Sequence, residues 1–153
     1  MPTAVSTTLE DIRNSVGHEI ACTDWLLLTQ EQIDAFAEAT GDRQWIHVDC
    51  ERAQRESPYG TTVAHGFLTL SLLSRFLAEA IQVRGAGMVV NYGLNRVRFT
   101  APVPAGSKIR ARFTLVSLKE FAGGVEAVFS VSIEGQHTEK PVCVVEWVIR
   151  YYA

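Results

Sequence analysis

The segment GFLTLSLLSRFLAEAI, residues 66–81, is the strongest indication of the fold of this chain. Its apolar side chains cover most of the circumference of a helix, and this predicts a long helix that is buried rather than on the surface. Strands are predicted to follow it at about residues 87–99, 108–121, 125–134 and 140–152. The pair Gly123-Gly124 favours a hairpin turn between the second and third strands. A buried helix followed by antiparallel strands predicts an α+β fold in which the sheet wraps around the helix.

A second helix is marked upstream, over residues 30–40. Thr29 and Gln32 have the Thr-x-x-Gln spacing of a capping box. Small and apolar residues then recur on one helix face, at Ile33, Phe36, Ala37 and Thr40. Gly41 stands where a left-handed residue is wanted to end a helix. Asp42 is therefore expected to be the first residue beyond this helix, with its direction set by the glycine turn.

The segments around these two helices are less regular. Residues 1–16 are a polar lead-in with a short helix expected over residues 9–15. Residues 19–28 predict a first strand, bounded by a glycine and a threonine. Residues 42–63 are expected to be irregular, with a short helical piece around residues 51–56.

Composition limits the classes of function. The chain has 153 residues, 47% of them hydrophobic, so residues 1–153 are expected to form a single domain with a proper core. A net charge of -3 offers no basic surface for nucleic acid. No apolar run reaches membrane-spanning length, and the N-terminus lacks the pattern of a secretory signal. Cys22, Cys50 and Cys143 fit neither a disulfide framework nor a zinc site, which predicts free thiols in a cytoplasmic protein.

The segment GDRQWIH, residues 41–47, carries the candidate chemistry. It puts a carboxylate, Asp42, and an imidazole, His47, five positions apart, directly after a helix end. Both are proton-transfer groups, and a loop held by a helix end can turn both into one cavity. Asp after Gly is also common in turns, so the spacing alone is typical of ordinary polar loop residues as well.

Three segments together resemble the MaoC-like dehydratases, also called the (R)-specific enoyl-CoA hydratase or hydratase 2 family. The family pattern Gly-Asp-x-Asn-Pro-apolar-His is matched here by Gly41, Asp42, Ile46 and His47. The chain has Gln44 where the family has Asn and Trp45 where it has Pro, and this variant looks like the nodulation-protein-N-like branch. Residues 64–71, AHGFLTLS, resemble the His-Gly turn that opens the central helix. Residues 91–103, NYGLNRVRFTAPV, resemble the strand and turn that follow it.

The resemblance implies a hotdog fold, in which a curved antiparallel sheet encloses one long helix. It implies a hydro-lyase that adds water to trans-2-enoyl thioesters to give (R)-3-hydroxyacyl thioesters, or the reverse dehydration. Asp42 and His47 are then the expected catalytic pair, holding the water between them. No cofactor is implied, since coenzyme A or phosphopantetheine is part of the acyl-thioester substrate. Small hotdog proteins usually pair through their sheets, so a homodimer or higher homo-oligomer is expected.

Further site residues follow from this chemistry. Negative charge develops on the thioester oxygen, and the helix start at Gly66 offers backbone N–H donors for that oxyanion. Gly66 could also serve only to let the turn form. Substrate-binding positions are expected at Gln44, Ser71 and Trp45. Two of them have structural alternatives, because the Ser71 hydroxyl can bond back to a helix carbonyl and Trp45 can be plain core.

Other polar residues are interpreted as structural. His65 is expected to be a turn residue rather than a second base. Arg96, Arg98, Arg110 and Arg112 are expected on the same face of two adjacent strands, where a solvated sheet face is favoured over contact with coenzyme A phosphates. No cluster of His, Cys or carboxylate has ligand spacing, so no metal site is predicted.

Two other functions stay open from the sequence. A non-catalytic acyl-thioester-binding or regulatory protein would fit the unusual Gln44-Trp45 pair. An acyl-CoA thioesterase would need a carboxylate on or beside the central helix, where Glu79, near the far end, is the only acidic residue. The Asp42 and His47 pair favours the hydro-lyase over both.

Overall fold

The computed structural model of the protein describes residues 4–153. Its helices are α1 (Leu9–Arg13), α2 (Gln30–Thr40), α3 (Trp45–Val48), α4 (Cys50–Glu56), α5 (Gly66–Ser71) and α6 (Leu73–Ala80). Its strands are β1 (Val5–Thr8), β2 (Glu19–Cys22), β3 (Leu26–Leu27), β4 (Ile81–Arg84), β5 (Met88–Phe99), β6 (Lys108–Phe121), β7 (Gly124–Gly135) and β8 (Pro141–Tyr152). None of the helices in this part of the chain is both long enough and apolar enough to cross a membrane.

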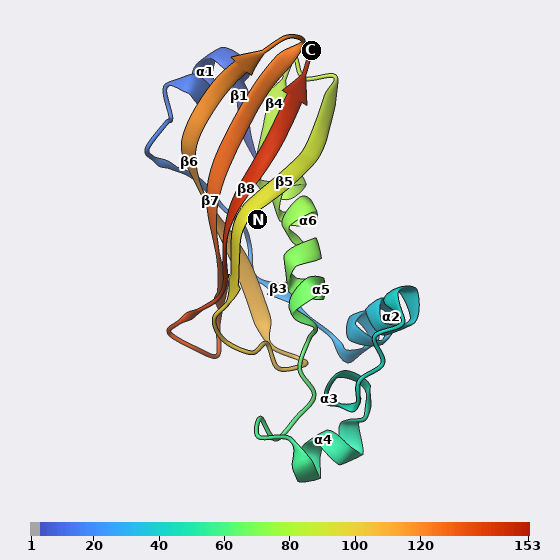
Figure 1. Cartoon of the computed structure of the whole chain (residues 1–153). Coiled ribbons are helices and arrows are strands. Elements are labelled where there is room, and N and C mark those ends of the chain that lie inside the picture. Colours follow the sequence, from blue (N-terminus) through green and yellow to red (C-terminus); the bar gives the residue numbers. More distant parts are fainter. Residues whose placement is uncertain (1–3) are drawn as a thin grey trace.

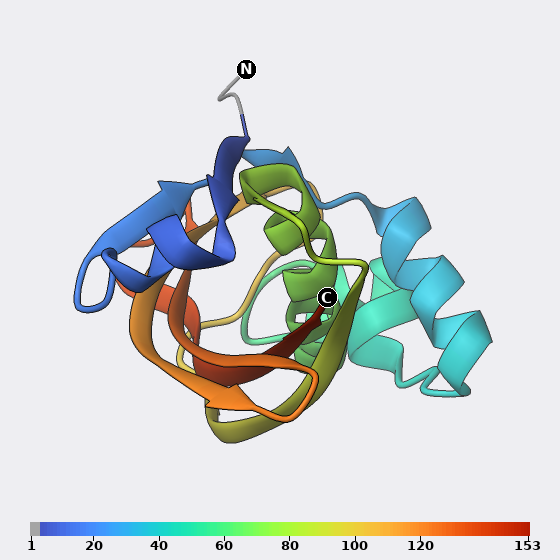
Figure 2. The same ribbon diagram turned by 90° about the horizontal axis from the view of Figure 1, so that it is seen from above.

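The long strands form one curved antiparallel sheet. Its strand order is β2-β6-β7-β8-β5, and β3 pairs with β6 as well. Figure 1 shows α5 and α6 along the inner side of this sheet, with α2, α3 and α4 projecting at one end. Seen from above in Figure 2, the sheet bends around the helix pair. The predicted α+β architecture, a sheet wrapped around a central helix as in a hotdog fold, is confirmed.

The core lies between the concave face of the sheet and the helix pair. Alternate residues along β6 and β7 are buried, among them Ile109, Ala111, Phe113, Leu115, Ala127, Phe129, Val131 and Ile133. Phe113 and Phe129 meet edge to face, with ring centroids 6.0 Å apart. Phe76 of α6 is fully buried in the same cluster. Because burial of each Val, Leu, Ile or Phe side chain contributes roughly 1.5–3 kcal/mol, apolar contact fixes the helix pair against the sheet.

The single helix predicted over residues 66–81 is divided into α5 and α6 at Leu72. The Leu72 amide is 3.2 Å from the Leu68 carbonyl and 3.3 Å from the Thr69 carbonyl, which is a locally tightened turn. The helix also ends before Ile81, whose extended backbone begins β4. The prediction of a buried central helix is confirmed, but its continuity and its last residue are corrected.

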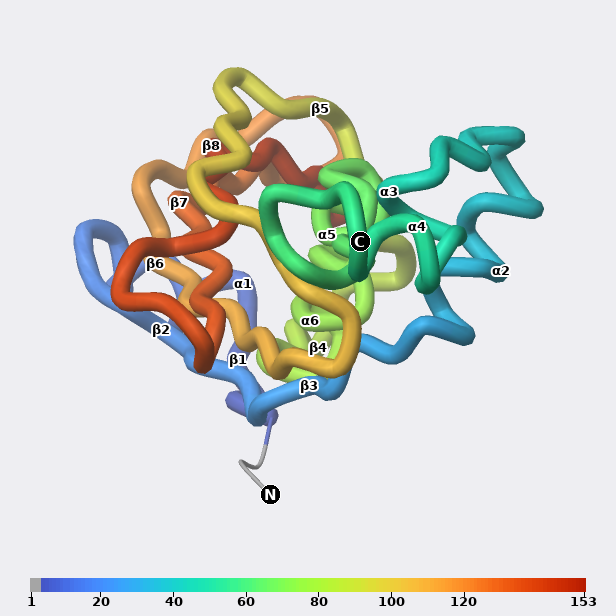
Figure 3. The backbone as a smooth tube through the Cα atoms, turned by 90° about the horizontal axis from the view of Figure 1, so that it is seen from below, coloured from blue at the N-terminus to red at the C-terminus, as the bar shows by residue number. Residues whose placement is uncertain are grey.

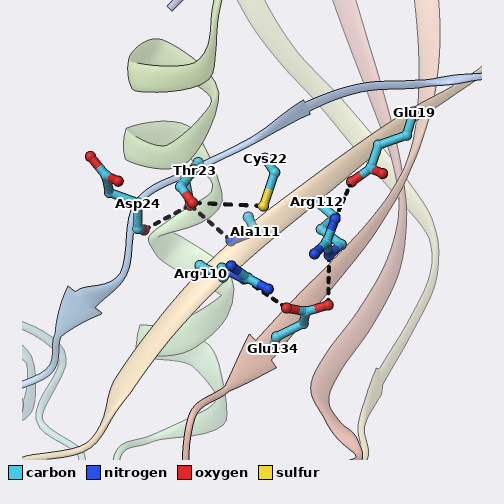
Figure 4. A network of polar contacts seen from close by, with 8 residues as sticks. All are labelled: Glu19, Cys22, Thr23, Asp24, Arg110, Ala111, Arg112 and Glu134. Carbon is cyan, nitrogen blue, oxygen red and sulfur yellow. Dashed lines mark hydrogen bonds and ion pairs between the residues drawn. The ribbon is translucent and has the colours of Figure 1, made fainter. Parts of the chain in front are cut away.

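Two strand features differ from the prediction. The polar lead-in contains β1, which pairs in parallel with β4. Residues 19–28 form β2 and β3 rather than one strand, because Thr23 interrupts the pairing with β6. The Ala111 amide donates to Thr23 Oγ1 at 2.9 Å, and the Thr23 amide donates to the Ala111 carbonyl at 2.9 Å (Figure 4). The hydroxyl replaces a strand carbonyl, so the chain leaves the sheet without a buried unpaired amide.

The arginines of β5 and β6 do not form one patch. These strands follow each other in the chain, but β7 and β8 lie between them in the sheet, so the prediction that they are adjacent is wrong. Arg110 and Arg112 each bond Glu134 at 2.7 Å, and Arg112 also bonds Glu19 at 2.8 Å (Figure 4). Burial raises the pKa of Glu134, but the bonds from the two arginines outweigh it and leave this pKa below its usual value. Arg110 and Arg112 thus belong to an ion-paired outer face.

Candidate active site

Helix α2 is held at both ends by the residues that the sequence marked. The Thr29 hydroxyl accepts from the Gln32 amide at 3.2 Å, and the Gln32 side chain accepts from the Thr29 amide at 3.0 Å. Gly41 ends the helix with φ +82°, and its amide donates to the Ala37 carbonyl at 2.8 Å. The predicted capping box and left-handed cap are confirmed. They fix the direction in which the chain enters Asp42.

His47 lies in a helical turn, not on the irregular segment expected from the sequence. The His47 amide donates to the Gln44 carbonyl at 3.0 Å, and the Asp49 amide donates to the Trp45 carbonyl at 3.0 Å. These bonds close α3, so Asp42 precedes a regular turn and His47 is part of it. The turn is only four residues long, too short for an apolar period to reveal it in the sequence.

The His47 ring has a defined tautomer. Its Nδ1 lies 2.7 Å from the Val63 carbonyl, which can only accept, so Nδ1 carries the proton. The backbone carbonyl of His47 accepts from Gln30 Nε2 at 2.8 Å, and the Thr62 hydroxyl donates to the Gln30 side-chain oxygen. The residue is 7% exposed. His47 Nε2 is left as the nitrogen able to take or give a proton.

His65 joins the two candidate groups, which the sequence did not predict. Its Nε2 donates to the backbone carbonyl of Asp42 at 2.9 Å. Its ring stacks on His47 with centroids 3.8 Å apart and planes at 24°, and Phe36 lies on it at 4.8 Å. His65 Nδ1 is buried and has no hydrogen-bond partner within the described residues. The one available signal was the position of His65 at the start of the central helix.

One carboxylate oxygen of Asp42 and one nitrogen of each ring of His47 and His65 lie within 4.8 Å of one another. A water oxygen bonded to two groups at about 2.8 Å each would fit between atoms so spaced. The two rings stack face to face, with their planes 24° apart. One nitrogen of each ring also bonds a carbonyl already. This geometry favours proton transfer over metal binding.

A cavity of about 350 Å³ lies beside this cluster. Its lining is mostly apolar and consists of Ile46, His47, Tyr59, Val63, Ala64, Gly66, Thr69, Phe99, Thr100, Ala101, Pro102, Val103 and Val142. Figure 3 shows the segment before α5 running close to the chain between β5 and β6. The Ala64 amide donates to the Val103 carbonyl at 2.8 Å and ties these two segments together. Tyr59, Thr69 and Phe99 are lining residues that sequence reasoning missed.

Gly66 lines this cavity at the first residue of α5. A Cβ at this position would lie 3.1 Å from the Phe99 ring, so the close packing suits a glycine. The first helical bond here is from the Thr69 amide to the His65 carbonyl, at 3.2 Å. The earlier amides of the turn therefore have no carbonyl of their own helix to bond. Asp42 is exposed and does not line the cavity itself.

The three substrate-binding candidates lie outside the cavity lining. Gln44 is exposed at the start of α3. Trp45 is half-buried, and the Arg52 guanidinium lies 4.3 Å from the centre of its ring. The Ser71 hydroxyl donates to the Phe67 carbonyl at 2.6 Å, the backward bond that was its structural alternative. The structure brings together Asp42 and His47, and Gly66 lines the same cavity as His47. Gln44, Trp45 and Ser71 lie at the periphery.

A second cavity, of about 480 Å³, lies farther along the central helix. Helix α6 and strands β4, β5 and β8 enclose it, through Ser74, Leu77, Ala78, Ile81, Gln82, Val83, Val89, Asn91, Trp147, Ile149 and Tyr151. The Trp147 indole N–H donates to the Asn91 side-chain oxygen at 2.7 Å, so this polar group at the cavity wall has a hydrogen-bond partner. The remaining lining is largely apolar, which suits a hydrocarbon chain.

Comparison with known proteins shows which family the chain resembles. Residues 11–136 match the MaoC like domain. The chain is 46% identical over 147 residues to 3-hydroxyacyl-thioester dehydratase Z of Mycobacterium tuberculosis, covering 95% of this chain and 97% of that protein. It is 43% identical over 144 residues to nodulation protein N of Rhizobium leguminosarum bv. viciae, covering 92% and 89%.

A solved structure agrees at the level of the fold. The (R)-hydratase from A. caviae involved in PHA biosynthesis superimposes with a TM-score of 0.72 at 24% identity, covering 88% of this chain and 94% of that one. The family match spans most of the chain, and it includes the Asp42 and His47 segment and the start of α5. This chain therefore belongs to the MaoC-like dehydratase family.

Proposed function

We propose that this protein is a hydro-lyase that adds water to trans-2-enoyl thioesters, giving (R)-3-hydroxyacyl thioesters, or that catalyses the reverse dehydration. The observation that carries the proposal is the approach of the Asp42 carboxylate and a His47 ring nitrogen within 4.8 Å, with His47 lining an apolar cavity. Family membership and a close relative named a 3-hydroxyacyl-thioester dehydratase support the reaction class.

The proposed reaction needs two proton transfers and one bond to water. The water oxygen attacks C3 of the enoyl thioester while one proton leaves the water and another reaches C2. Asp42 and the free Nε2 of His47 act as the pair that removes one proton and supplies the other. Because their carboxylate and imidazole are coupled across one water, the acid and base roles belong to the pair. No cofactor takes part in these steps, and coenzyme A or phosphopantetheine enters as part of the substrate.

The thioester oxygen gains negative charge as C3 is attacked. We place that oxygen at the start of α5, where the Gly66 amide and its neighbours have no helical acceptor. Fixed N–H donors stabilise such charge, and loss of one donor typically costs about a hundredfold or more in turnover in other enzymes. The absence of a side chain at Gly66 lets the substrate approach these amides.

The peripheral candidates are given lesser roles in this proposal. The exposed Gln44 amide is free to orient the water or the Asp42 segment. Trp45 supports α3 through its contact with Arg52, at the edge of the acyl site. Ser71 is given a structural role, because it lies outside the cavity lining and its hydroxyl donates to the Phe67 carbonyl. The apolar cavity along α6 offers room for the far end of a longer acyl chain.

We also propose that the protein is a homodimer formed through β5. This strand is at an edge of the sheet, so one side of its backbone has no neighbouring strand in the described chain. Large apolar side chains on β5 are exposed, at Met88, Val89, Tyr92, Leu94 and Phe99. Such a strip on an open edge is typical of a contact surface. Pairing of two β5 strands would satisfy the open backbone edge and shield exposed side chains beside it, such as Leu94, while Val89 and Phe99 line the two cavities.

The test is hydration of a panel of trans-2-enoyl-CoA esters, from short to long chains, with chiral analysis of the product. The proposal predicts the (R)-alcohol and no free thiol. Release of free thiol would instead indicate a thioesterase, a reaction for which the site offers little, because Glu79 is exposed and paired with Arg75 at 2.8 Å. Tight binding of the esters without turnover, by folded protein, would indicate a non-catalytic acyl-binding protein.

A further inference from the structure

His65 contacts both members of the proposed catalytic pair. Its Nε2–H bonds the backbone carbonyl of Asp42 at 2.9 Å, and its ring stacks on the His47 ring at 3.8 Å. The two partners come from different elements, since Asp42 follows α2 and His47 belongs to α3. His65 comes from a third place, directly before α5. It is thus the one residue of this cluster that links the Asp42 turn, α3 and the central helix.

The contacts of His65 leave it no nitrogen for proton transfer with substrate. Nε2 is committed to the Asp42 carbonyl. Nδ1 is enclosed and has no hydrogen-bond partner among residues 4–153, and the residue as a whole is 2% exposed. His65 is also not among the residues that line the cavity beside His47. A role as a second base is therefore excluded by access, and what remains is an effect on the groups that it touches.

That effect is to fix two directions at once. The bond from His65 Nε2 to the Asp42 carbonyl fixes the backbone of the first residue after the Gly41 turn. The Asp42 side chain therefore starts from a backbone position that does not move. The stacked ring sets the plane of His47, while the Nδ1 bond to the Val63 carbonyl sets its rotation within that plane. Phe36 lies at 4.8 Å from the His65 ring and backs it. A displacement of about 1 Å in such groups can cost about a hundredfold in rate.

We propose that His65 is a positioning residue for the reaction, which holds the Asp42 carboxylate and His47 Nε2 in register across the attacking water. The inference rests on the proposed function. It assigns to the His-Gly turn a task beyond starting the helix, because the same imidazole that precedes Gly66 aligns the proton-transfer pair.

The test compares wild type with His65→Leu and His65→Gln. Leucine fills the site but offers neither the ring nor the N–H, so kcat should fall about a hundredfold, with KM changed less than about threefold. Glutamine can place an amide N–H near the position of Nε2, so it should recover part of the loss, to within about tenfold of wild type. The matched control is Thr23→Val, which removes a buried hydroxyl bond in the sheet at a residue that does not line the cavity. It should lower the melting temperature and leave kcat per folded molecule unchanged.

A second readout does not depend on turnover. Amide hydrogen exchange over residues 43–49 should rise by about tenfold or more in His65→Leu and stay unchanged in Thr23→Val, since only the former frees the Asp42 turn. The proposal is overturned if folded His65→Leu keeps kcat within about twofold of wild type. It is equally overturned if exchange over residues 43–49 does not change. If wild type hydrates no ester, the proposed function fails, and the exchange result alone decides whether His65 holds this segment.

Discussion

Asp42 and His47 are brought together by two separate local devices. Gly41 ends α2 in a left-handed conformation and directs the chain into Asp42. His47 is oriented by the bond from its Nδ1 to the Val63 carbonyl, 16 residues away in the chain. The end of α2 at Gly41 was predicted from the sequence, because a capping box and a glycine mark the two ends of this helix. The bond between His47 and Val63 joins residues distant in the chain, and no spacing rule could reveal it.

The contacts of His65 also join residues that are distant in the chain, so the sequence could not predict them. Its neighbours Phe36, Asp42 and His47 are spread over three segments, and only the folded chain shows that they meet. In sequence it reads as a polar residue before a helix. The expectation of a structural turn residue captured its burial but not its contacts with the candidate pair.

Gly66→Ala tests whether the space at the start of α5 matters to the reaction. The new Cβ would stand 3.1 Å from the Phe99 ring, which is half-exposed and can turn away. The fold should therefore persist, while the methyl group crowds the proposed oxyanion position. We expect kcat to fall by about tenfold or more, with a melting temperature close to that of wild type. Steady-state kinetics and thermal unfolding check this, and an unchanged kcat would remove Gly66 from the site.

Ser71→Ala tests a residue that the structure places at the periphery. Its hydroxyl bonds the Phe67 carbonyl, and that carbonyl keeps its acceptor role toward the helix without it. We expect less than about a threefold change in kcat and in KM. Kinetics with a short and a long enoyl-CoA ester measure both. A loss of about a hundredfold or more in kcat would mean that Ser71 contacts the substrate directly.

Helix α2 sets the direction of the segment that carries the proposed catalytic pair. Gly41 has φ +82° with open space around its missing Cβ, so an alanine there meets no neighbour but must adopt a strained backbone. Gly41→Ala should lower the free energy of unfolding by about 1 kcal/mol and should also reduce kcat, because relief of the strain turns Asp42. Gly17→Ala is the matched control, since Gly17 has φ +88° and equally open space. It should cost similar stability in urea unfolding and leave kcat unchanged. Equal kcat in both variants would mean that the α2 cap does not aim Asp42.

The long strands β5 to β8 and helix α2 were predicted to within one or two residues, because an alternating period or an explicit cap marks them. The short elements were not. β1 is only four residues long and pairs with β4. The paired residues are far apart in the chain, since Ile81 lies 76 positions after its partner Val5. The break at Leu72 lies inside a segment whose apolar residues predict one continuous helix, so the sequence did not indicate it. The split between β2 and β3 depends on one Thr23 hydroxyl, whose partner Ala111 is 88 positions away.

The sequence did not reveal the order of the strands in the sheet, which is β2-β6-β7-β8-β5. Arg96 and Arg110 belong to consecutive strands, yet those strands are separated by β7 and β8 in the sheet. The chain between β5 and β6 crosses beneath the start of α5 and supplies part of the cavity lining. This crossing leaves β5 at the edge, with its apolar side chains exposed.

Leu94→Glu tests the proposed pairing through β5. Leu94 is 40% exposed on the edge strand, so a carboxylate there costs the monomer little but would be buried in a β5 to β5 interface. We expect wild type to sediment as a dimer and Leu94→Glu to shift toward monomer. Val116→Glu is the control, because Val116 is 46% exposed on β6, in the interior of the strand order. Its oligomeric state should match wild type. A dimer that survives Leu94→Glu unchanged would place the interface elsewhere.

In the proposed reaction, the Asp42 and His47 pair adds water to an enoyl thioester. The most direct measurement is the turnover of the best trans-2-enoyl-CoA ester by wild type and by Asp42→Asn, side by side, with circular dichroism to verify equal folding. Asparagine keeps the size and polarity of the side chain but cannot accept a proton. We predict formation of the (R)-3-hydroxyacyl product by wild type and a loss of about a hundredfold or more in kcat in Asp42→Asn. Full turnover by folded Asp42→Asn would mean that the Asp42 carboxylate takes no part in proton transfer.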